Sequence, residues 1–451
     1  MICLHAYLDA DKLSGGTMAS ALWNSLASLF PKSWGLEHKP DLTKSPVGLP
    51  NNDNNDDRKW NDEVGAMLNM MLEMAGYPEI SRGIHCNFFQ ESVAPSLGQH
   101  PRGTGTPSWK SFMTDDNTPV ELSWCWSSSL DTPTVRYSAE PIGKWAGQPA
   151  DPNNAAASLR LFGDALQLSP EMDLYLHRHF QRSLMASIIT NEADKALIPP
   201  SQSFIAFDLL ESTIIVKQYY LPAWRALAEQ KSNFALVEDA IRDIPSLGTS
   251  LLSSFAVFTD YIQSLPNETR PKVEIMAIDC LDPLKSRLKV YIRSQSTTLD
   301  SVLQILTIGG KAPKTPEEKA SLRELWHSIF GLDQHQNDET PLPEKDHRTG
   351  GILYYFEFKS GVDIPKTKVY LPVRHYARDD LQIATGLSRY LDHRGKRLTT
   401  GSYLEGVQSL CKHRNLSDGL GLHTYICWAS ENNTWNVTAY FNPEVYHPSR
   451  G

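Results

Sequence analysis

The stretch KSRLKVYIRS, residues 285–294, decides the fold that we expect for this chain. Successive side chains of a β-strand point to opposite faces, so Arg287, Lys289 and Tyr291 share one face and the apolar residues between them take the other. A strand of this kind separates an apolar layer from a polar space. The pattern predicts a sheet with one face of basic and phenolic side chains.

The same arrangement recurs along the chain. Lys217 and Tyr219 form a second basic-x-Tyr pair, Lys368 and Tyr370 form a third, and Arg136 supplies a further cation. The corresponding positions, separated by 81, 72, 79 and 72 residues, are Arg136, Lys217, Lys289, Lys368 and Tyr440. A nearly constant spacing of this size indicates a repeated structural unit.

Each copy lies in a predicted β-hairpin. In the first, apolar and polar side chains alternate over PVELSWCW (119–126), and TVRYSAE (134–140) follows a turn. The other four predicted hairpins join Phe204–Leu210 to Thr213–Tyr220, Lys272–Asp279 to Ser286–Arg293, Leu353–Phe358 to Thr367–Pro372, and His423–Ala429 to Trp435–Phe441. Helical spacing of apolar residues predicts helices over Trp60–Ala75, Ser158–Ala186, Tyr220–Leu265, Thr315–Phe330, Asp379–Leu391 and Tyr403–His413.

These elements predict an α/β protein of the α+β type, in which ten antiparallel strands form one sheet with helices on its apolar face. Such a sheet closes into a barrel because closure removes its exposed edges, and its polar face then lines the lumen. We expect residues 60–451 to form this single domain. Residues 1–59 are expected to be an N-terminal extension and loop, partly flexible, and Gly331–Gly351 a variable loop.

Basic side chains from several strands would meet in this lumen. Neighbouring cations repel each other there unless an anion compensates them. Four basic strands therefore predict a site for a highly charged anion such as a phosphate group. For any single copy, the alternative is an exposed strand whose lysine holds its charged head in water.

The composition restricts the class of protein. Hydrophobic residues make up 41% of the 451 residues and charged residues 21%, as in ordinary globular proteins. A net charge of −9 removes the electrostatic basis for a nucleic-acid partner. The six cysteines form no CxxC pair, which argues against a disulfide framework or a zinc knuckle. A polar start and the lack of long apolar runs predict a soluble, cytoplasmic protein without a membrane partner.

We expect no metal in the site. Three aspartate pairs, at 56–57, 115–116 and 379–380, lack the third, spaced aspartate of magnesium-dependent diphosphate sites and fit helix caps and turns. The run Gly309-Gly310-Lys311 lacks the spacing of a phosphate-binding loop, and there is no GxSxG motif. A phosphoryl-transfer or hydrolytic enzyme is therefore disfavoured.

Longer motifs occur in the same hairpins and beside them: TDDNTPVELSW, TVRYSAEPIG, DPNN (151–154), KSRLKVY, TIGG and PKTKVYLPVRHYA. They closely resemble the dimethylallyltryptophan synthase family of aromatic prenyltransferases, and the likeness runs roughly from Trp60 to Asn442. The resemblance implies an ABBA barrel, in which five ααββ repeats form a ten-stranded antiparallel barrel surrounded by helices. The hairpin count agrees with it.

The resemblance also implies an activity. A dimethylallyl group would pass from dimethylallyl diphosphate to an electron-rich aromatic acceptor by electrophilic substitution, without a metal or another cofactor, in secondary metabolism. Glu121 resembles the glutamate that accepts a hydrogen bond from the acceptor and helps to remove its proton. The implied diphosphate clamp consists of Arg136, Lys217, Arg287, Lys289 and Lys368, the last standing where some members have glutamine. The implied tyrosine shield around the allyl cation consists of Tyr219, Tyr291, Tyr370, Tyr425 and Tyr440.

One position departs from the family. Members that prenylate free tryptophan at the indole 4-position carry a lysine where this chain has Phe204. We therefore expect another acceptor, such as an indole alkaloid, a cyclic dipeptide or a phenolic compound, and a monomer or homodimer. The alternative is a non-catalytic barrel that binds a phosphorylated or acidic small molecule, which would need the cations but not the tyrosines.

Overall fold

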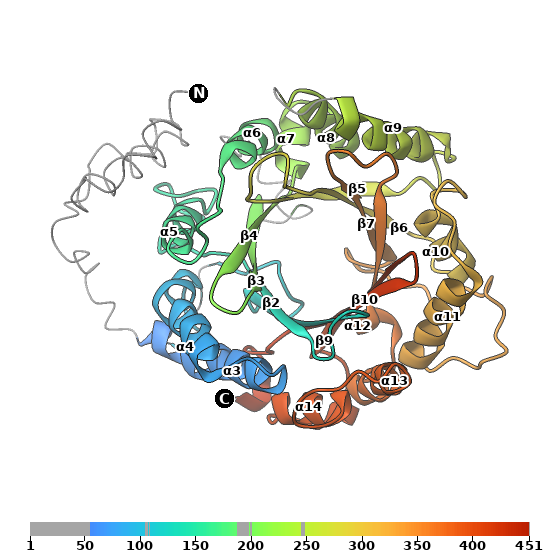
Figure 1. The fold of residues 1–451 in the computed structure, drawn as a ribbon. Helices are drawn as coiled ribbons and strands as arrows, with labels where there is room; N and C mark the ends of the chain where they lie inside the picture. Colours follow the sequence, from blue (N-terminus) through green and yellow to red (C-terminus); the bar gives the residue numbers. More distant parts are fainter. Residues whose placement is uncertain are drawn as a thin grey trace.

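The computed structural model describes residues 55–103, 107, 109–186, 198, 201–244 and 249–450. Ten strands in this part of the chain form one closed barrel, in the order β1-β10-β9-β8-β7-β6-β5-β4-β3-β2. Each strand is antiparallel to both of its neighbours. Figure 1 looks into the barrel and shows the helices arranged around its outside. The predicted fold class is confirmed.

The five predicted hairpins are confirmed, with ends shifted by at most two residues. They are β1 (Val120–Ser127) with β2 (Thr134–Ala139), β3 (Ser203–Leu209) with β4 (Ile214–Tyr220), β5 (Lys272–Asp279) with β6 (Leu288–Ser294), β7 (Ile352–Phe358) with β8 (Lys366–Leu371), and β9 (His423–Glu431) with β10 (Thr434–Phe441).

The helices form the outer layer (Figure 1). The first set precedes the barrel and comprises α2 (Asp56–Trp60), the π-helical η3 (Asn61–Gly65), α3 (Ala66–Met74), α4 (Glu79–Phe88), the π-helical η4 (Phe89–Val93) and the short η5 (Ala94–Ser96). The others are α5 (Ala156–Ala165), α6 (Tyr175–Leu184), α7 (Ala223–Ala228), α8 (Asn233–Arg242), α9 (Thr249–Ser264), α10 (Leu299–Leu306), α11 (Pro316–Phe330), α12 (Val373–Tyr376), α13 (Asp380–Asp392), α14 (Tyr403–Leu410), η7 (Leu416–Asp418) and η8 (Pro448–Arg450).

Two stretches that were each predicted as one helix are divided into several helices in the structure. The stretch Ser158–Ala186 is divided into α5 and α6, because Pro170 lies between them and cannot continue a helix. The stretch Tyr220–Leu265 is divided into α7, α8 and α9. Gln230 takes a left-handed φ of 55° after α7, and the Ser232 side chain caps the start of α8. Helices α4, α10 and α12 were not predicted.

The main core lies between the barrel and the helices. On β1, Trp124 and Trp126 are fully buried and pack edge-on against Tyr403 of α14. Around the barrel, Phe258 of α9 packs against Phe356 of β7. The apolar side chains of each strand thus point outward to the helices, and the polar side chains are left to the lumen, as the alternation predicts.

The predicted extension 1–59 falls almost entirely on residues 1–54, which lie outside the described residues. Its boundary with the domain 60–451 stays a prediction, although helix α2 already begins at Asp56. Of the helices in the described ranges, none combines the length and the apolar character needed to cross a membrane.

Candidate active site

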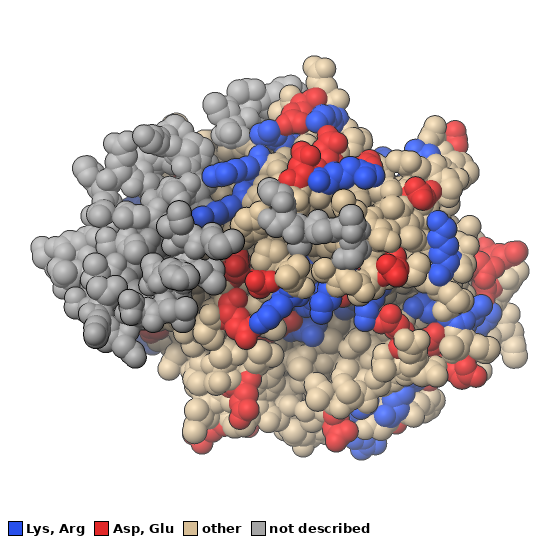
Figure 2. All heavy atoms as spheres, turned by 45° about the horizontal axis from the view of Figure 1, so that its top comes forward, with Lys and Arg blue, Asp and Glu red and all other residues tan. Residues whose placement is uncertain are grey.

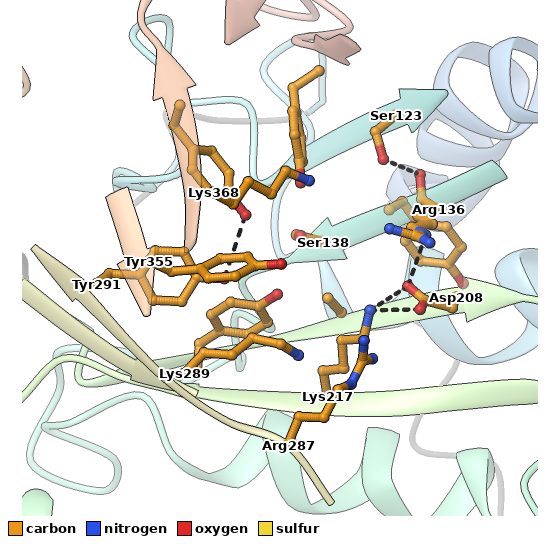
Figure 3. A pocket seen from close by; sticks show the side chains of 15 residues that line it. Ser123, Arg136, Ser138, Asp208, Lys217, Arg287, Lys289, Tyr291, Tyr355 and Lys368 are labelled. Carbon is orange, nitrogen blue, oxygen red and sulfur yellow. Dashed lines mark hydrogen bonds and ion pairs between the residues drawn. The ribbon is translucent and has the colours of Figure 1, made fainter. Parts of the chain in front are cut away.

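A cavity opens in the barrel lumen. Figure 3 shows its lining side chains, which come from strands on all sides and point toward a common space. The five predicted diphosphate-binding residues and four of the five predicted tyrosines line it: Arg136, Lys217, Arg287, Lys289, Lys368, Tyr219, Tyr291, Tyr370 and Tyr440. The structure therefore brings these nine residues together.

Carboxylates that the sequence analysis missed lie among the cations. The strand register places each beside a basic residue of the next strand, in the pairs Arg136 with Asp208, Lys217 with Asp279, and Lys289 with Glu357. The alternation of side chains along β3 and β5 could have predicted two of these carboxylates, because Asp208 and Asp279 occupy inward positions of these strands.

Asp208 and Asp279 each hold two cations. The Lys217 Nζ donates to both oxygens of Asp208, at 2.6 and 2.5 Å, and the Arg136 Nε lies 3.2 Å from Oδ1 (Figure 3). Asp279 accepts from the Arg287 Nε at 2.5 Å and from the Lys289 Nζ at 2.9 Å. These ion pairs fix the directions of four long basic side chains in advance of any ligand.

The remaining contacts are looser. The Arg287 Nη1 lies 3.6 Å from Glu357, and the Lys368 Nζ donates to the Thr438 Oγ1 at 3.1 Å. The Lys368 Nζ also lies 5.3 Å from the centre of the Tyr370 ring. Five cations face three carboxylates, so positive charge remains in excess and a site for an anion is preserved. Figure 2 shows basic side chains gathered in the middle of one face, with acidic side chains beside them.

Burial and these ion pairs together set the pKa values of Asp208 and Lys217. Burial opposes the charge of Asp208, but Arg136 and Lys217 outweigh it and lower its pKa to about 2. Burial lowers the pKa of Lys217 to about 8, which Asp208 counteracts and the positive charges of Arg136 and Lys289 reinforce. Lys217 is thus charged at neutral pH but loses its proton under mildly basic conditions.

Tyrosine rings form the wall next to the cations. The Tyr291 ring centre lies 6.0 Å from that of Tyr219, 5.5 Å from Tyr355 and 5.7 Å from Tyr370, and Tyr370 lies 5.8 Å from Tyr440. Tyr355 was not predicted, although it alternates with Glu357 on the inward face of β7. The cavity therefore has a charged part and an aromatic part in contact with each other.

Phe204, the position that departs from the family, does not line the cavity itself but packs against one of its tyrosines. Its ring stacks on that of Tyr219 at 4.3 Å, with an angle of 15° between the planes. It adds an apolar surface where a lysine would bring a charge.

Glu121 and Tyr425 do not line the cavity itself. Glu121 is half-buried on β1, one inward position beyond Ser123, and accepts a hydrogen bond from the Thr424 Oγ1 at 2.5 Å. Burial raises the pKa of Glu121 to about 7, although the Thr424 hydrogen bond and Arg374 counteract it. Tyr425 packs edge-on against Tyr370 at 6.1 Å. Both residues lie beyond the tyrosine rings, away from the five basic residues that line the cavity.

One group of side chains in the described ranges has ligand atoms spaced for a metal: Cys411, His413 and Glu444. None of them lines the cavity. Arg414 binds both oxygens of Glu444, so this carboxylate already has a cationic partner.

Comparisons with known proteins bear on the chemistry. The sequence profile of the family described as Tryptophan dimethylallyltransferase matches residues 56–405. The chain is 47% identical to 4-O-dimethylallyl-L-tyrosine synthase of Claviceps purpurea (strain 20.1), over 87% of this chain and 89% of that protein. It is 31% identical to 7-dimethylallyltryptophan synthase of Aspergillus fumigatus, over 86% of this chain and 85% of that protein.

Solved structures have the same fold. AnaPT from Neosartorya fischeri superimposes with a TM-score of 0.73 at 25% identity, over 88% of this chain and 95% of that one. NotF in complex with brevianamide F and DMSPP superimposes with a TM-score of 0.74 at 22% identity, over 88% and 97% of the two chains. At this level of identity, the second match concerns the fold alone.

Proposed function

The chain belongs to the tryptophan dimethylallyltransferase family, and from this premise we propose that it transfers the dimethylallyl group of dimethylallyl diphosphate to the phenolic oxygen of L-tyrosine. It is an aromatic prenyltransferase, and the non-catalytic alternative is dropped. The choice of acceptor rests on one observation: the tyrosine synthase is 47% identical to this chain, whereas the tryptophan synthase is 31% identical. A phenolic compound was among the acceptors expected from the sequence.

The cations of the cavity would bind the diphosphate. When the bond between the allylic carbon and the diphosphate oxygen breaks, negative charge grows on the leaving group. Arg136, Lys217, Arg287 and Lys289 are already held toward this space by Asp208 and Asp279, so little reorganisation is needed. Lys368 would add a further contact to the diphosphate.

The tyrosine rings would stabilise the allyl cation. A cation over a desolvated aromatic face gains about 1–2 kcal/mol from each ring. The rings of Tyr219, Tyr291, Tyr355, Tyr370 and Tyr440 also exclude water, which would otherwise capture the cation as an alcohol. Tyr425 would continue this wall toward Glu121.

Glu121 would act as the general base. The phenolic oxygen attacks the allylic carbon, a carbon–oxygen bond forms, and the phenolic proton passes to the Glu121 carboxylate while diphosphate is released. A carboxylate with a pKa of about 7 is a stronger base than an ordinary one and is still half ionised at neutral pH.

We also propose that this chemistry needs no metal, because the carboxylates closest to the cations are already bound by lysine and arginine. Nor does the proposal need another cofactor. A cytoplasmic location is supported by five unpaired cysteines, Cys86, Cys125, Cys280, Cys411 and Cys427, since thiols persist in reducing compartments. A monomer or homodimer remains the proposed state, to be checked by light scattering.

The experiment is incubation of purified protein with dimethylallyl diphosphate and either L-tyrosine or L-tryptophan, with products identified by mass spectrometry. We expect prenylated tyrosine whose ring no longer gives the phenolate absorbance shift in alkali, because its oxygen carries the prenyl group. A product that keeps this shift would place the prenyl group on carbon. Turnover of L-tryptophan but not of L-tyrosine would refute the proposed acceptor.

A further inference from the structure

A second group of charged side chains lies beyond the tyrosine rings, on the side of Glu121. Its three arginines are Arg293, Arg348 and Arg374, which we call the arginine cluster. Arg293 is the next inward residue of β6 after Tyr291. Arg374 belongs to α12, and its charge counteracts the effect of burial on the pKa of Glu121. The cluster thus borders the space where an acceptor would meet the base.

Arg293 is fully engaged. Its Nε and Nη2 donate to the two oxygens of Glu274, at 2.7 and 2.8 Å, and its Nη1 donates to the Thr349 carbonyl at 2.9 Å. This bidentate pair is neutral as a unit. Glu274 thus neutralises the charge of Arg293, and this pair provides no net positive charge for a ligand.

Arg374 is only partly engaged. Its Nη2 donates to the Tyr425 hydroxyl at 3.1 Å, and its Nη1 lies 3.3 Å from Asp115. The guanidinium also lies 4.8 Å from the centre of the Tyr425 ring. The Arg374 side chain is only 7% exposed, yet its Nε is buried without a hydrogen-bond partner. A buried N–H in this state costs free energy that an added acceptor would recover.

Arg348 forms no hydrogen bond or ion pair with the residues that the structure describes, and it is exposed to solvent. Partial desolvation lowers its pKa; Glu274 and Tyr425 raise the pKa, and the charges of Arg374 and Arg293 lower it. Three carboxylates lie near the three arginines: Glu274 is held by Arg293, Asp115 pairs with Arg374, and Glu121, with a pKa of about 7, is only partly ionised at neutral pH. Among the described residues, no carboxylate pairs with Arg348 itself.

The backbone beside Arg348 is held in place. The next residue, Thr349, accepts from Arg293 through its carbonyl and shares side-chain hydrogen bonds with His347 and His375, at 2.9 and 2.8 Å. Gly351 donates to the Tyr376 hydroxyl at 2.7 Å and has a left-handed φ of 81°. The loop predicted as variable is thus anchored on both sides at the point where Arg348 leaves it.

We infer that Arg348 and Arg374 bind the α-carboxylate of a free amino-acid acceptor and so select amino acids over phenols that lack this group. The inference rests on the proposed function. With the phenol between Glu121 and the tyrosine rings, the carboxylate lies at the far end of the acceptor, away from the diphosphate. This orientation keeps the two anions apart and brings the second one to the arginines.

The test compares substrates that differ only in the head group. We would measure kcat/KM with L-tyrosine, with tyramine, which lacks the carboxylate, and with 3-(4-hydroxyphenyl)propanoate, which lacks the ammonium group. For Arg348→Ala we expect a loss of roughly 10- to 100-fold with the two carboxylates, as for a lost hydrogen bond to a charged group, and a change of less than about threefold with tyramine. Arg348→Glu should lose more with the carboxylates and again spare tyramine.

Lys319→Ala is the matched control, because it removes one exposed positive charge from the outer helix α11 and should change none of the three values. An equal loss with tyramine, or no loss with L-tyrosine, would overturn the inference. If the wild type ignores L-tyrosine, the proposed function fails by itself. The same comparison of kcat/KM, in the wild type and in Arg348→Ala, is then made with L-tryptophan and with tryptamine, which lacks the carboxylate. The inference is also overturned if the protein turns over neither L-tyrosine nor L-tryptophan.

Discussion

Glu121, the proposed general base, shows how burial changes the basicity of an ordinary carboxylate. A solvated glutamate is almost fully ionised at neutral pH but is a weak base. Burial at the edge of the lumen raises its pKa to about 7, while the Thr424 hydroxyl holds one of its oxygens. The carboxylate is thereby oriented and made more basic in the same step.

Its titration predicts a pH dependence. Proton removal needs ionised Glu121, so kcat/KM for L-tyrosine should rise as the pH increases through about 7. Diphosphate binding needs protonated Lys217, so the rate should fall again above about 8. Glu121→Gln should lose roughly 10²- to 10⁴-fold in kcat and should lack the rising limb in a pH–rate profile. Persistence of that limb in the variant would assign it to another group.

A second prediction at this scale concerns Lys289, whose side chain is only 6% exposed and binds Asp279. Lys289→Ala removes one cation and leaves Asp279 short of a partner, so the site should repel the diphosphate. We expect kcat/KM for dimethylallyl diphosphate to fall roughly 10²- to 10³-fold.

The control for it is Lys285→Ala, in the turn of the same hairpin, where the lysine is 64% exposed and pairs with Glu171 at the surface. This variant should stay within about twofold of the wild type, as expected for a surface pair. Equal losses in the two variants would show that the position of the charge is unimportant.

At the scale of elements, the hairpin is the unit that carries both the core and the site. Its outward residues pack under the helices, and its inward residues supply one cation or one tyrosine after another. Cross-strand register then decides which inward residues become neighbours, as in the pair of Arg136 and Asp208. A shift by one residue would exchange the two faces of a strand and lose both functions together.

The helical layer depends on close approach. Gly386 of α13 lies against the Ser328 carbonyl of α11, and a Cβ there would clash with backbone. Gly386→Ala should therefore lower the free energy of unfolding by about 1–3 kcal/mol. Urea unfolding followed by tryptophan fluorescence measures it.

Gly83 of α4 gives the matched comparison. It is exposed, and a Cβ at this position would meet nothing within 4 Å. Gly83→Ala should raise the free energy of unfolding by about 0.5–1 kcal/mol, because alanine loses less backbone entropy in a helix. Opposite signs for the two variants are the expected result; destabilisation in both would show that the loss at Gly386 is not specific to its close contact with Ser328.

At the scale of the whole molecule, closure of the barrel creates an interior that excludes bulk water yet carries positive charge. The protein as a whole has a net charge of −9, so the excess of positive charge in the lumen is local, and so is the diphosphate binding that we propose there. Counter-ions within the wall make this concentration of cations compatible with folding, because unpaired buried charges are costly.

This arrangement predicts activity without a metal. In excess EDTA the purified protein should keep its rate of prenyl transfer to within about twofold, because lysine and arginine perform the charge neutralisation that a divalent ion would supply. Product formation with and without added magnesium, at matched ionic strength, measures the difference. Loss of turnover in EDTA that magnesium restores would disprove the proposed metal-free site.

The sequence by itself determined the ten strands, their inward faces and nine of the side chains that line the cavity. Period-2 alternation is a local property, and residues such as Arg287, Lys289 and Tyr291 reveal their shared face without knowledge of their neighbours. The family resemblance supplied the role expected for Glu121. The alternation within one strand and the resemblance of one motif say nothing about which residues of different strands contact each other.

Only the tertiary structure decided which charges compensate each other. Asp208 and Asp279 are unremarkable in their own strands and become counter-ions through cross-strand register. Arg348 precedes β7 and Arg374 follows β8, so the antiparallel pairing of these two strands places both at the same end of the hairpin. Helix α12 packs against β9, and β10 joins β9 to β1, which brings this end of the hairpin to the side of Glu121. Electrostatic interactions depend on distance in space, and barrel closure sets those distances between residues that are remote in the chain.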